Sequence, residues 1–480
     1  MHIERSGRRG RGPIWQLWPL TLAAVFLATP AVAQNAVAAP PPPATADAGL
    51  RRMNLGEARA YARAHQPRLL AARQRLVAAQ SDARVPGAQW LPRIGAMGQI
   101  VGGTANNSTS TLLGTSVVDL PRIGGTKVEG TADARPYATT GVALGIRQEI
   151  FDFGRIAAER NAATLASEVE RFRVLGAGFD VDLGVEQAYF AVRAALSIAE
   201  ASRGAYDRAV QHRDQARANV QSGMRPPIEL TRAEADVARY EAGMVRANAS
   251  VHVARSVFAV AVGVDDVELD AEAMPEESPE LPALEAVLRG AERGPALREA
   301  QARLRAQAAE TRRLELQTRP NLSATAAISA RAGGATPSSG PVPWGDGWAP
   351  VVPNYDVGVV LTWPFLEPTL DRRADASRER ERALSYESSA SLRAQRGIIA
   401  AAYFDADVAR QALAALTRGA DAARANYEQA ENRFRVGLGT STELADAQAL
   451  RTEADIQLAI GKFQVSKTRA VLQRAIAETP

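Results

Sequence analysis

Residues 213–233, RDQARANVQSGMRPPIELTRA, decide the fold, because a stretch with the same pattern occurs at residues 427–447, YEQAENRFRVGLGTSTELADA. In each stretch a helical pattern stops at a glycine and resumes a few residues later. At a constant shift of 214 residues the two share Gln215-Ala216 and Gln429-Ala430, Gly223 and Gly437, Leu230 and Leu444, and Ala233 and Ala447. The chain is therefore expected to contain two helical hairpins related by duplication.

The duplication extends towards the N-terminus at a shift of 228 residues. Glu57-Ala58, Pro67, Leu76 and Ala78 return as Glu285-Ala286, Pro295, Leu304 and Ala306. The difference between the two shifts lies between Pro92 and Tyr189, so each copy is one unit of about 220 residues with a loop of variable length. We expect a first repeat over 50–263, an acidic Pro-rich linker over 264–283 and a second repeat over 284–478.

The first 33 residues have the features of a secretory signal peptide. Four arginines precede a mostly apolar stretch over 14–28, and Ala31-Val-Ala33 is typical of a cleavage site. An N-terminal membrane anchor is the alternative. Residues 34–49 are rich in proline and alanine and are expected to form a tether without a core of its own.

Composition argues against several classes of function. The chain has no cysteine, which excludes thiolate metal sites, cysteine nucleophiles, disulfides and an N-terminal lipid acceptor. Its four histidines have no ligand spacing, and its Gly-Gly pairs lack the strand–loop–helix context of a phosphate site. The formal net charge is +4, much of it in the signal. We therefore expect no enzyme, no cofactor, no metal site and no nucleic-acid partner.

Each copy contains two segments in which apolar residues alternate with polar or small ones. They lie at about 91–102 and 139–150 in the first copy, and at about 321–330 and 355–365 in the second, where Val357, Val359 and Leu361 share one face. This length suits tilted membrane strands, although a soluble sheet with one wet face would alternate too. Aromatic residues at the segment ends would form a membrane girdle: Trp90, Phe151, Phe153, Trp363 and Phe365.

The remaining sequence is helical in pattern. From Gly154 to Ser222 apolar residues recur near the 3.5-residue period of coiled coils, with Tyr206 and Val210 continuing the series, and a matching helix is expected over 371–436. Helices of this length would measure on the order of 100 Å. Return helices are expected over 229–262 and 442–476.

The number of strands has a consequence for assembly. Bare strand edges cannot face lipid, and four strands are too few to close a barrel. No segment after the signal has the roughly 20 apolar residues of a spanning helix. If these are membrane strands, several chains must pool them, and three chains would supply twelve.

Three motifs carry a resemblance to a known family. They are Phe434-Arg-Val-Gly-Leu438 with Thr442-Glu-Leu-Ala-Asp446 at the second turn, Trp363-Pro-Phe-Leu-Glu367, and Ile150-Phe-Asp-Phe-Gly154. With the order of elements over about 50–478, the chain resembles the outer-membrane efflux protein family, the TolC-like exit ducts. The resemblance implies an all-α fold with a small membrane β part, a homotrimer with a 12-stranded barrel in the outer membrane of a Gram-negative bacterium, and a helical tunnel across the periplasm. It also implies outer-membrane lipid contact, a periplasmic adaptor and an inner-membrane pump, in drug efflux, metal efflux or type I secretion.

The resemblance also implies functional residues at the hairpin turns. Glu229, Glu443 and Asp446 match acidic positions at the pore constriction, although acids at a helix start can instead stabilise the helix dipole. The expected adaptor contacts, which can also be ordinary turn residues, are Gly223, Met224, Val436, Gly437 and Leu438.

The sequence departs from the family at the closing latch. In some members an aromatic hydroxyl and an arginine hold the tips closed, whereas the matching residues here are Phe434 and Gly439. Either Arg225 or Arg435 could take over by pairing with Glu229. The alternative from another class is a periplasmic coiled-coil scaffold or adhesin without a pore, whose strands would pack against helices.

Overall fold

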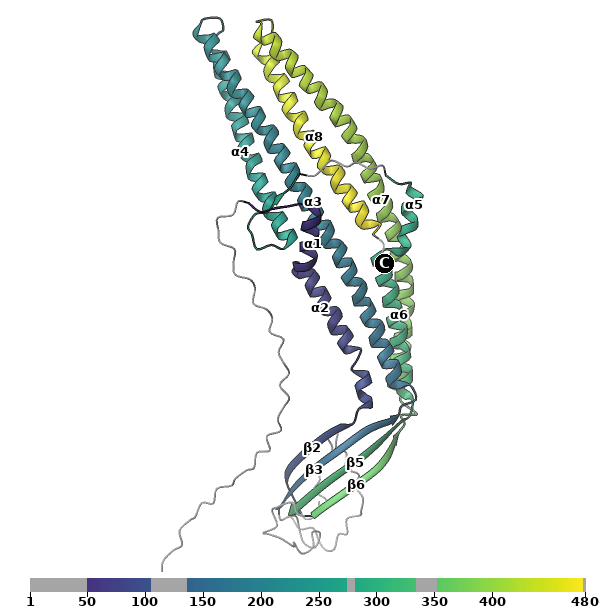
Figure 1. Ribbon diagram of the computed structural model, residues 1–480. Helices are drawn as coiled ribbons and strands as arrows, with labels where there is room; N and C mark the ends of the chain where they lie inside the picture. The colour runs from purple at the N-terminus through teal and green to yellow at the C-terminus, as the bar shows by residue number, and fades with distance from the viewer. Residues whose placement is uncertain (1–49, 105–135, 274–280, 334–351, 478–480) are drawn as a thin grey trace, which may run out of the picture. The chain divides into compact units, whose positions relative to one another are not determined.

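The computed structural model describes residues 50–104, 136–273, 281–333 and 352–477 (Figure 1). The predicted signal peptide over 1–33 and tether over 34–49 lie outside these residues. Most of both strand-connecting loops also lies outside them.

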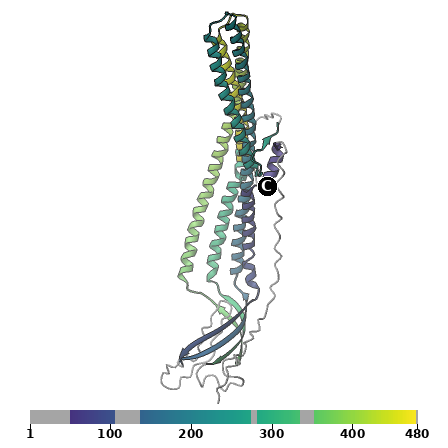
Figure 2. The ribbon, with the colours of Figure 1, turned by 90° about the vertical axis from the view of Figure 1, so that its left-hand side faces the viewer.

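Two long helical hairpins account for more than half of the described residues, as the duplicated pattern predicts. The first consists of α3 (Arg155–Gln221) and α4 (Ile228–Val262), and the second of α7 (Pro368–Arg435) and α8 (Ser441–Ala475). Shorter helices pack beside them in each copy (Figures 1 and 2): α1 (Leu55–His65) and α2 (Pro67–Asp82) in the first, and α5 (Leu284–Arg289) and α6 (Pro295–Glu315) in the second. Among the described helices, none has an apolar stretch long enough to cross a bilayer.

The four predicted strands form one antiparallel sheet in the order β2-β3-β5-β6. The strands are β2 (Arg93–Thr104), β3 (Pro136–Phe151), β5 (Asn321–Gly333) and β6 (Val352–Thr362). β2 begins two residues later than predicted and β6 ends three residues earlier. Pro92 directly precedes β2 and has no N–H to donate to a ladder, which explains the later start, whereas Pro353 lies inside β6 and pairs with Ala330.

Packing of the first hairpin differs from the sequence expectation in one place. The predicted seam continues through Tyr206 and Val210, but the residues fully buried there are Ala205 and Ala209. Tyr206 and Val210 are only partly buried, so this part of the prediction is wrong by one position. Alanine at the seam lets neighbouring helices approach closely, which the apolar period alone did not reveal.

Two core clusters stabilise the middle of the chain. In the first copy Tyr189, Val192 and Phe258 are fully buried against α1 and against β4 (Asp270–Ala271), which pairs in parallel with β1 (Arg52–Met53). In the second copy Ile399 and Leu472 form a smaller cluster with α5. The first cluster attaches α1 and α2 to the first hairpin, and the second attaches α5 to the second hairpin.

The sheet leads directly into the first hairpin. Asp152 lies between β3 and α3 and is buried, and its carboxylate accepts hydrogen bonds from the backbone N–H groups of Gly154, at 3.1 Å, and Ile156. Because a carboxylate at a helix start satisfies free N–H groups, this aspartate fixes where α3 begins.

Candidate functional site

The two hairpin turns have the same backbone geometry. At the first, the N–H groups of Met224 and Arg225 donate to the carbonyl of Asn219, and at the second those of Leu438 and Gly439 donate to the carbonyl of Arg433. Gly223 and Gly437 have positive φ angles of 75° and 78°, which glycine adopts without strain. The repeated sequence at the turns therefore corresponds to the same helix C-terminal structure in both copies.

The start of α8 has side-chain caps that the start of α4 lacks. Thr440 accepts a hydrogen bond from the N–H of Glu443 at 3.2 Å, and the Glu443 carboxylate accepts one from the N–H of Thr440 at 3.3 Å. This is a capping box. Glu443 thus has a structural role at the start of α8.

Arg225 connects the two hairpins. Its guanidinium lies 3.4 Å from the Glu229 carboxylate, donates to the carbonyl of Gly439 at 3.2 Å, and lies 5.5 Å from the ring centroid of Phe434. Arg435 instead lies 4.0 Å from Glu431 on its own helix. Of the two candidate arginines, only Arg225 pairs with Glu229, and Phe434 and Gly439 take part in the same contact.

The three predicted constriction acids have different environments. The Glu229 side chain is 11% exposed, and its Oε2 atom is buried without a hydrogen-bond partner in the described structure. Glu443 is 52% exposed, with Arg433 at 4.0 Å, and Asp446 is exposed on the same helix. Their role at a pore stays a prediction.

The predicted adaptor-contact residues lie at the surface of the turns. Met224 is 71% exposed and Leu438 is 75% exposed, and Gly223, Val436 and Gly437 are exposed beside them. Large apolar side chains at the ends of two hairpins are typical of an interaction surface. Whether an adaptor is the partner stays a prediction.

The sheet has one continuous apolar face. Across the ladders, Ile146 pairs with Ile94 and Ala326, and Ala326 pairs with Val357. These side chains are exposed where they are large, up to 82% for Val357. The opposite face has mostly polar or small residues, and on it Arg93 donates to the buried Glu149 at 3.1 Å. Aromatic residues lie where the chain passes between this sheet and helices: Trp90, Phe151, Phe153, Trp363 and Phe365.

The structure also contains a polar cluster between the hairpins that the sequence analysis missed. Tyr427 of α7 lies between Arg208 and Arg451, at 5.6 Å and 4.9 Å from its ring centroid, and its hydroxyl is 2.9 Å from His212 Nε2. Burial lowers the pKa of His212 and raises that of Tyr427. The four-residue spacing of Arg208 and His212, which places both on one face of α3, was the available signal.

Comparisons with known proteins agree with this architecture. The profile of the family described as outer membrane efflux protein matches residues 59–264 and 289–478. No curated protein sequence matches the chain.

Several solved structures share the fold. The outer-membrane channel OprN is 19% identical with a TM-score of 0.69, covering 88% of this chain and 90% of that chain. The outer membrane protein VceC of Vibrio cholerae is 17% identical with a TM-score of 0.67, covering 88% and 96%. The CmeC outer membrane channel of Campylobacter jejuni is 15% identical with a TM-score of 0.70, covering 88% and 85%.

The family profile covers both repeats, and the fold is that of TolC-like channels, which confirms the resemblance based on the sequence motifs. This chain belongs to the outer membrane efflux protein family, and it is a protein of the outer membrane with a periplasmic helical domain.

Proposed function

We propose that this protein is the exit duct of a tripartite efflux or type I secretion system. Three chains pool their strands in a 12-stranded barrel, and their hairpins form a tunnel through the periplasm. An inner-membrane pump and a periplasmic adaptor deliver the substrate, which the duct conducts passively.

The observation that carries this proposal is the sheet with one apolar face and two free edges. In the described residues, β2 and β6 each pair on one side only. An unpaired edge in lipid leaves N–H and C=O groups without partners, at several kcal/mol each, and a closed barrel removes this cost. Pairing β6 of one chain with β2 of the next satisfies both edges.

The same sheet argues against a scaffold or adhesin without a pore. In that alternative, the face with Tyr355, Val357 and Val359 would pack against a helix. Instead these side chains are exposed, and no described helix makes substantial contact with β5 or β6. An exposed apolar face of four strands favours lipid as its environment.

Cysteine cross-linking tests the pooled barrel. Because the chain has no native cysteine, every cross-link must come from the introduced residues. Met97→Cys in β2 is combined with single cysteines along β6, and outer-membrane fractions are oxidised. We expect a cross-linked trimer on a non-reducing gel at one register. The control pair Leu144→Cys with Ile328→Cys joins neighbours within one chain and gives a monomer. Monomers for every β2–β6 pair would contradict the proposal.

The exposed turn residues are proposed to contact the adaptor. Met224→Asp with Leu438→Asp places two charges on an apolar surface about 100 Å along α3 from the strands, so the trimer is expected to form normally. Export should be lost, because the apolar contact surface is lost. Normal export at normal expression would remove these turns from the docking surface.

We propose that Glu443 and Asp446 line the constriction, where three copies would concentrate six carboxylates and attract cations. Glu443→Gln keeps the capping box, since glutamine also serves at this position, and therefore separates the charge from the cap. With Asp446→Asn, cation preference and block by multivalent cations in planar bilayers should decrease. If neither changes, the two acids face away from the pore.

A further inference from the structure

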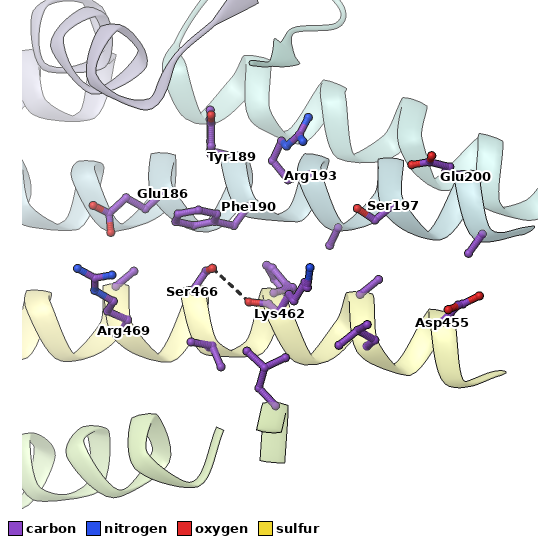
Figure 3. A pocket seen from close by; sticks show the side chains of 18 of the residues that line it. Glu186, Tyr189, Phe190, Arg193, Ser197, Glu200, Asp455, Lys462, Ser466 and Arg469 are labelled. Atoms are coloured by element: carbon purple, nitrogen blue, oxygen red, sulfur yellow. Dashed lines mark hydrogen bonds between the residues drawn. The ribbon is translucent and has the colours of Figure 1, made fainter. Parts of the chain in front are cut away.

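An elongated cavity of about 770 Å³ lies between α3 and α8, with additional walls from α1 and α7 (Figure 3). On α3 its lining extends from Glu186 to Arg208, about 33 Å of helix. Figure 3 shows Glu186 and Phe190 on one side of it and Lys462 and Ser466 on the other. The volume is in the range of small-molecule sites.

The cavity has an excess of positive charge. Its acidic lining residues are Glu186, Glu200 and Asp455, whereas its basic lining residues are Arg59, Arg193, Arg208, Arg424, Arg451, Lys462 and Arg469. Glu186 pairs with Arg59, and Asp455 accepts from Arg424 at 2.7 Å and lies 3.8 Å from Arg451. Neither Arg193 nor Arg208 has a carboxylate partner among the described residues.

The charge is concentrated at Arg208 and Arg451. Both guanidinium groups pack on the ring of Tyr427, and the Nε atom of each is buried without a hydrogen-bond partner among the described residues. The pKa of Arg208 is lowered, first by burial and then by repulsion from Arg451. Arg451 shares Asp455 with Arg424, and Arg208 has no carboxylate partner among the described residues. The pair therefore keeps an excess of positive charge that an oxyanion would satisfy, because planar guanidinium groups bind carboxylate or phosphate oxygens in pairs.

The rest of the lining is suited to an apolar body. Phe190 of α3 and Leu458 and Phe463 of α8 line the cavity beyond Arg451. From Arg451 to Phe463 the helix rises about 18 Å, so one elongated molecule can reach both the charged end and the aromatic side chains. A small inorganic ion would leave this part of the cavity empty.

We propose that the cavity between α3 and α8 binds an anionic amphiphile, with its oxyanion at Arg208 and Arg451 and its apolar body along Phe190, Leu458 and Phe463. The ligand is a free molecule and not a bilayer lipid. Arg208 lies about 80 Å along α3 from Arg155, where the chain leaves the sheet, and this distance is beyond the reach of a headgroup.

Calorimetry on the full-length protein in phosphatidylcholine nanodiscs tests the site, with empty nanodiscs subtracted. The probes are dodecanoate, dodecyltrimethylammonium and inorganic phosphate. We expect saturable binding of dodecanoate, one molecule per chain, and much weaker binding of the other two. Equal binding of the cationic amphiphile would contradict the proposal that the site selects an anion. Equal binding of phosphate would contradict the proposal that an apolar body contributes to binding. Absence of dodecanoate binding would mean that another chain covers the cavity, and would also overturn the proposal.

Three variants locate the bound molecule. Arg208→Gln with Arg451→Gln should weaken dodecanoate binding by about tenfold or more, since charge-assisted hydrogen bonds are lost. Ala194→Trp fills the cavity, leaves every charge in place and should abolish binding even if the double variant perturbs Tyr427. Arg203→Gln, on the same helix but highly exposed, is the matched control and should bind normally. Unchanged affinity in Ala194→Trp would place the ligand elsewhere.

Discussion

The two hairpin turns are copies of one backbone, yet they are stabilised differently. The second turn contains its own cap, with Thr440 and Glu443 satisfying each other's N–H groups. The first turn has Pro226-Pro227 at the corresponding place and no side-chain cap. It depends on Arg225, which pairs with Glu229 and donates to Gly439 of the other turn. The second turn is therefore stabilised by contacts within itself, whereas the first turn is stabilised by a contact with the second.

The largest effect is expected from Arg225→Ala. The substitution removes the ion pair, the bond to Gly439 and the packing on Phe434, and it leaves Glu229 mostly buried without its partner. Loss of a hydrogen bond to a charged group costs about 1.5–3 kcal/mol. Hydrogen exchange should accelerate over residues 219–230 and 433–444.

Arg435→Ala is the matched control, because this exposed arginine lies 4.0 Å from Glu431 on its own helix. It should change exchange at the turns little, since exposed ion pairs contribute about 0–1 kcal/mol. Equal effects of both substitutions would mean that Arg225 does not connect the hairpins.

Gly439→Ala should destabilise only the second turn. A Cβ atom there would lie 3.0 Å from the N atom of Phe434 and 3.2 Å from the carbonyl carbon of Arg433, both backbone atoms that cannot move away easily. We expect a loss of about 1–3 kcal/mol in local stability, as for other overpacked sites. Gly397→Ala should instead be neutral or stabilising, because no described residue beyond its own helical turn lies within 4 Å of the added Cβ atom. Faster hydrogen exchange confined to 430–446 would agree with this expectation, and an undisturbed turn would contradict it.

Thr440→Ala removes one half of the capping box and should destabilise the start of α8 by about 1 kcal/mol. Pro227→Ala at the matching place of the first copy should have less effect on side-chain capping, since this residue makes no cap bond. Hydrogen exchange at the first turn of each helix measures the difference. Equal responses would mean that the two helix starts are not stabilised differently.

The smallest effect concerns pH. His212 contacts Tyr427 across the hairpins, and burial lowers its pKa, with Glu431 and Asp236 opposing the shift and Arg208 adding to it. A histidine released by opening titrates near pH 6.5 and takes up a proton before the packed one does. The free energy that stabilises the contact is therefore largest above about pH 6.5. It decreases as the pH falls below this value and becomes constant again below the lowered pKa of the packed histidine. The protection of residues 205–216 from hydrogen exchange should show this pH dependence. His212→Gln should remove the pH dependence. If the pH dependence persists in the variant, another titrating group causes it.

The sequence predicted the constriction acids and tip residues as a set, but not their environments. Glu229, Glu443 and Asp446 all follow a turn glycine, and the one local distinction is the Thr440-Ser-Thr-Glu443 spacing, which suits a capping box. In the structure, Glu229 is mostly buried beside Arg225, Glu443 caps a helix and Asp446 is exposed. Burial depends on which residue of the other hairpin comes close, and that residue is more than 200 positions away in the chain.

The sequence by itself determined the duplication, the two long hairpins, the positions of their turns and the four alternating strands. These features follow from local rules: glycine permits positive φ, proline does not continue a helix, and apolar spacing distinguishes helix from strand. Only the tertiary structure decided that Arg225 meets Phe434 and Gly439, and that Arg208 and Arg451 share the ring of Tyr427. The spacing of residues along a helix determines which of them share a face. The register between two helices, however, is determined by packing along their whole lengths.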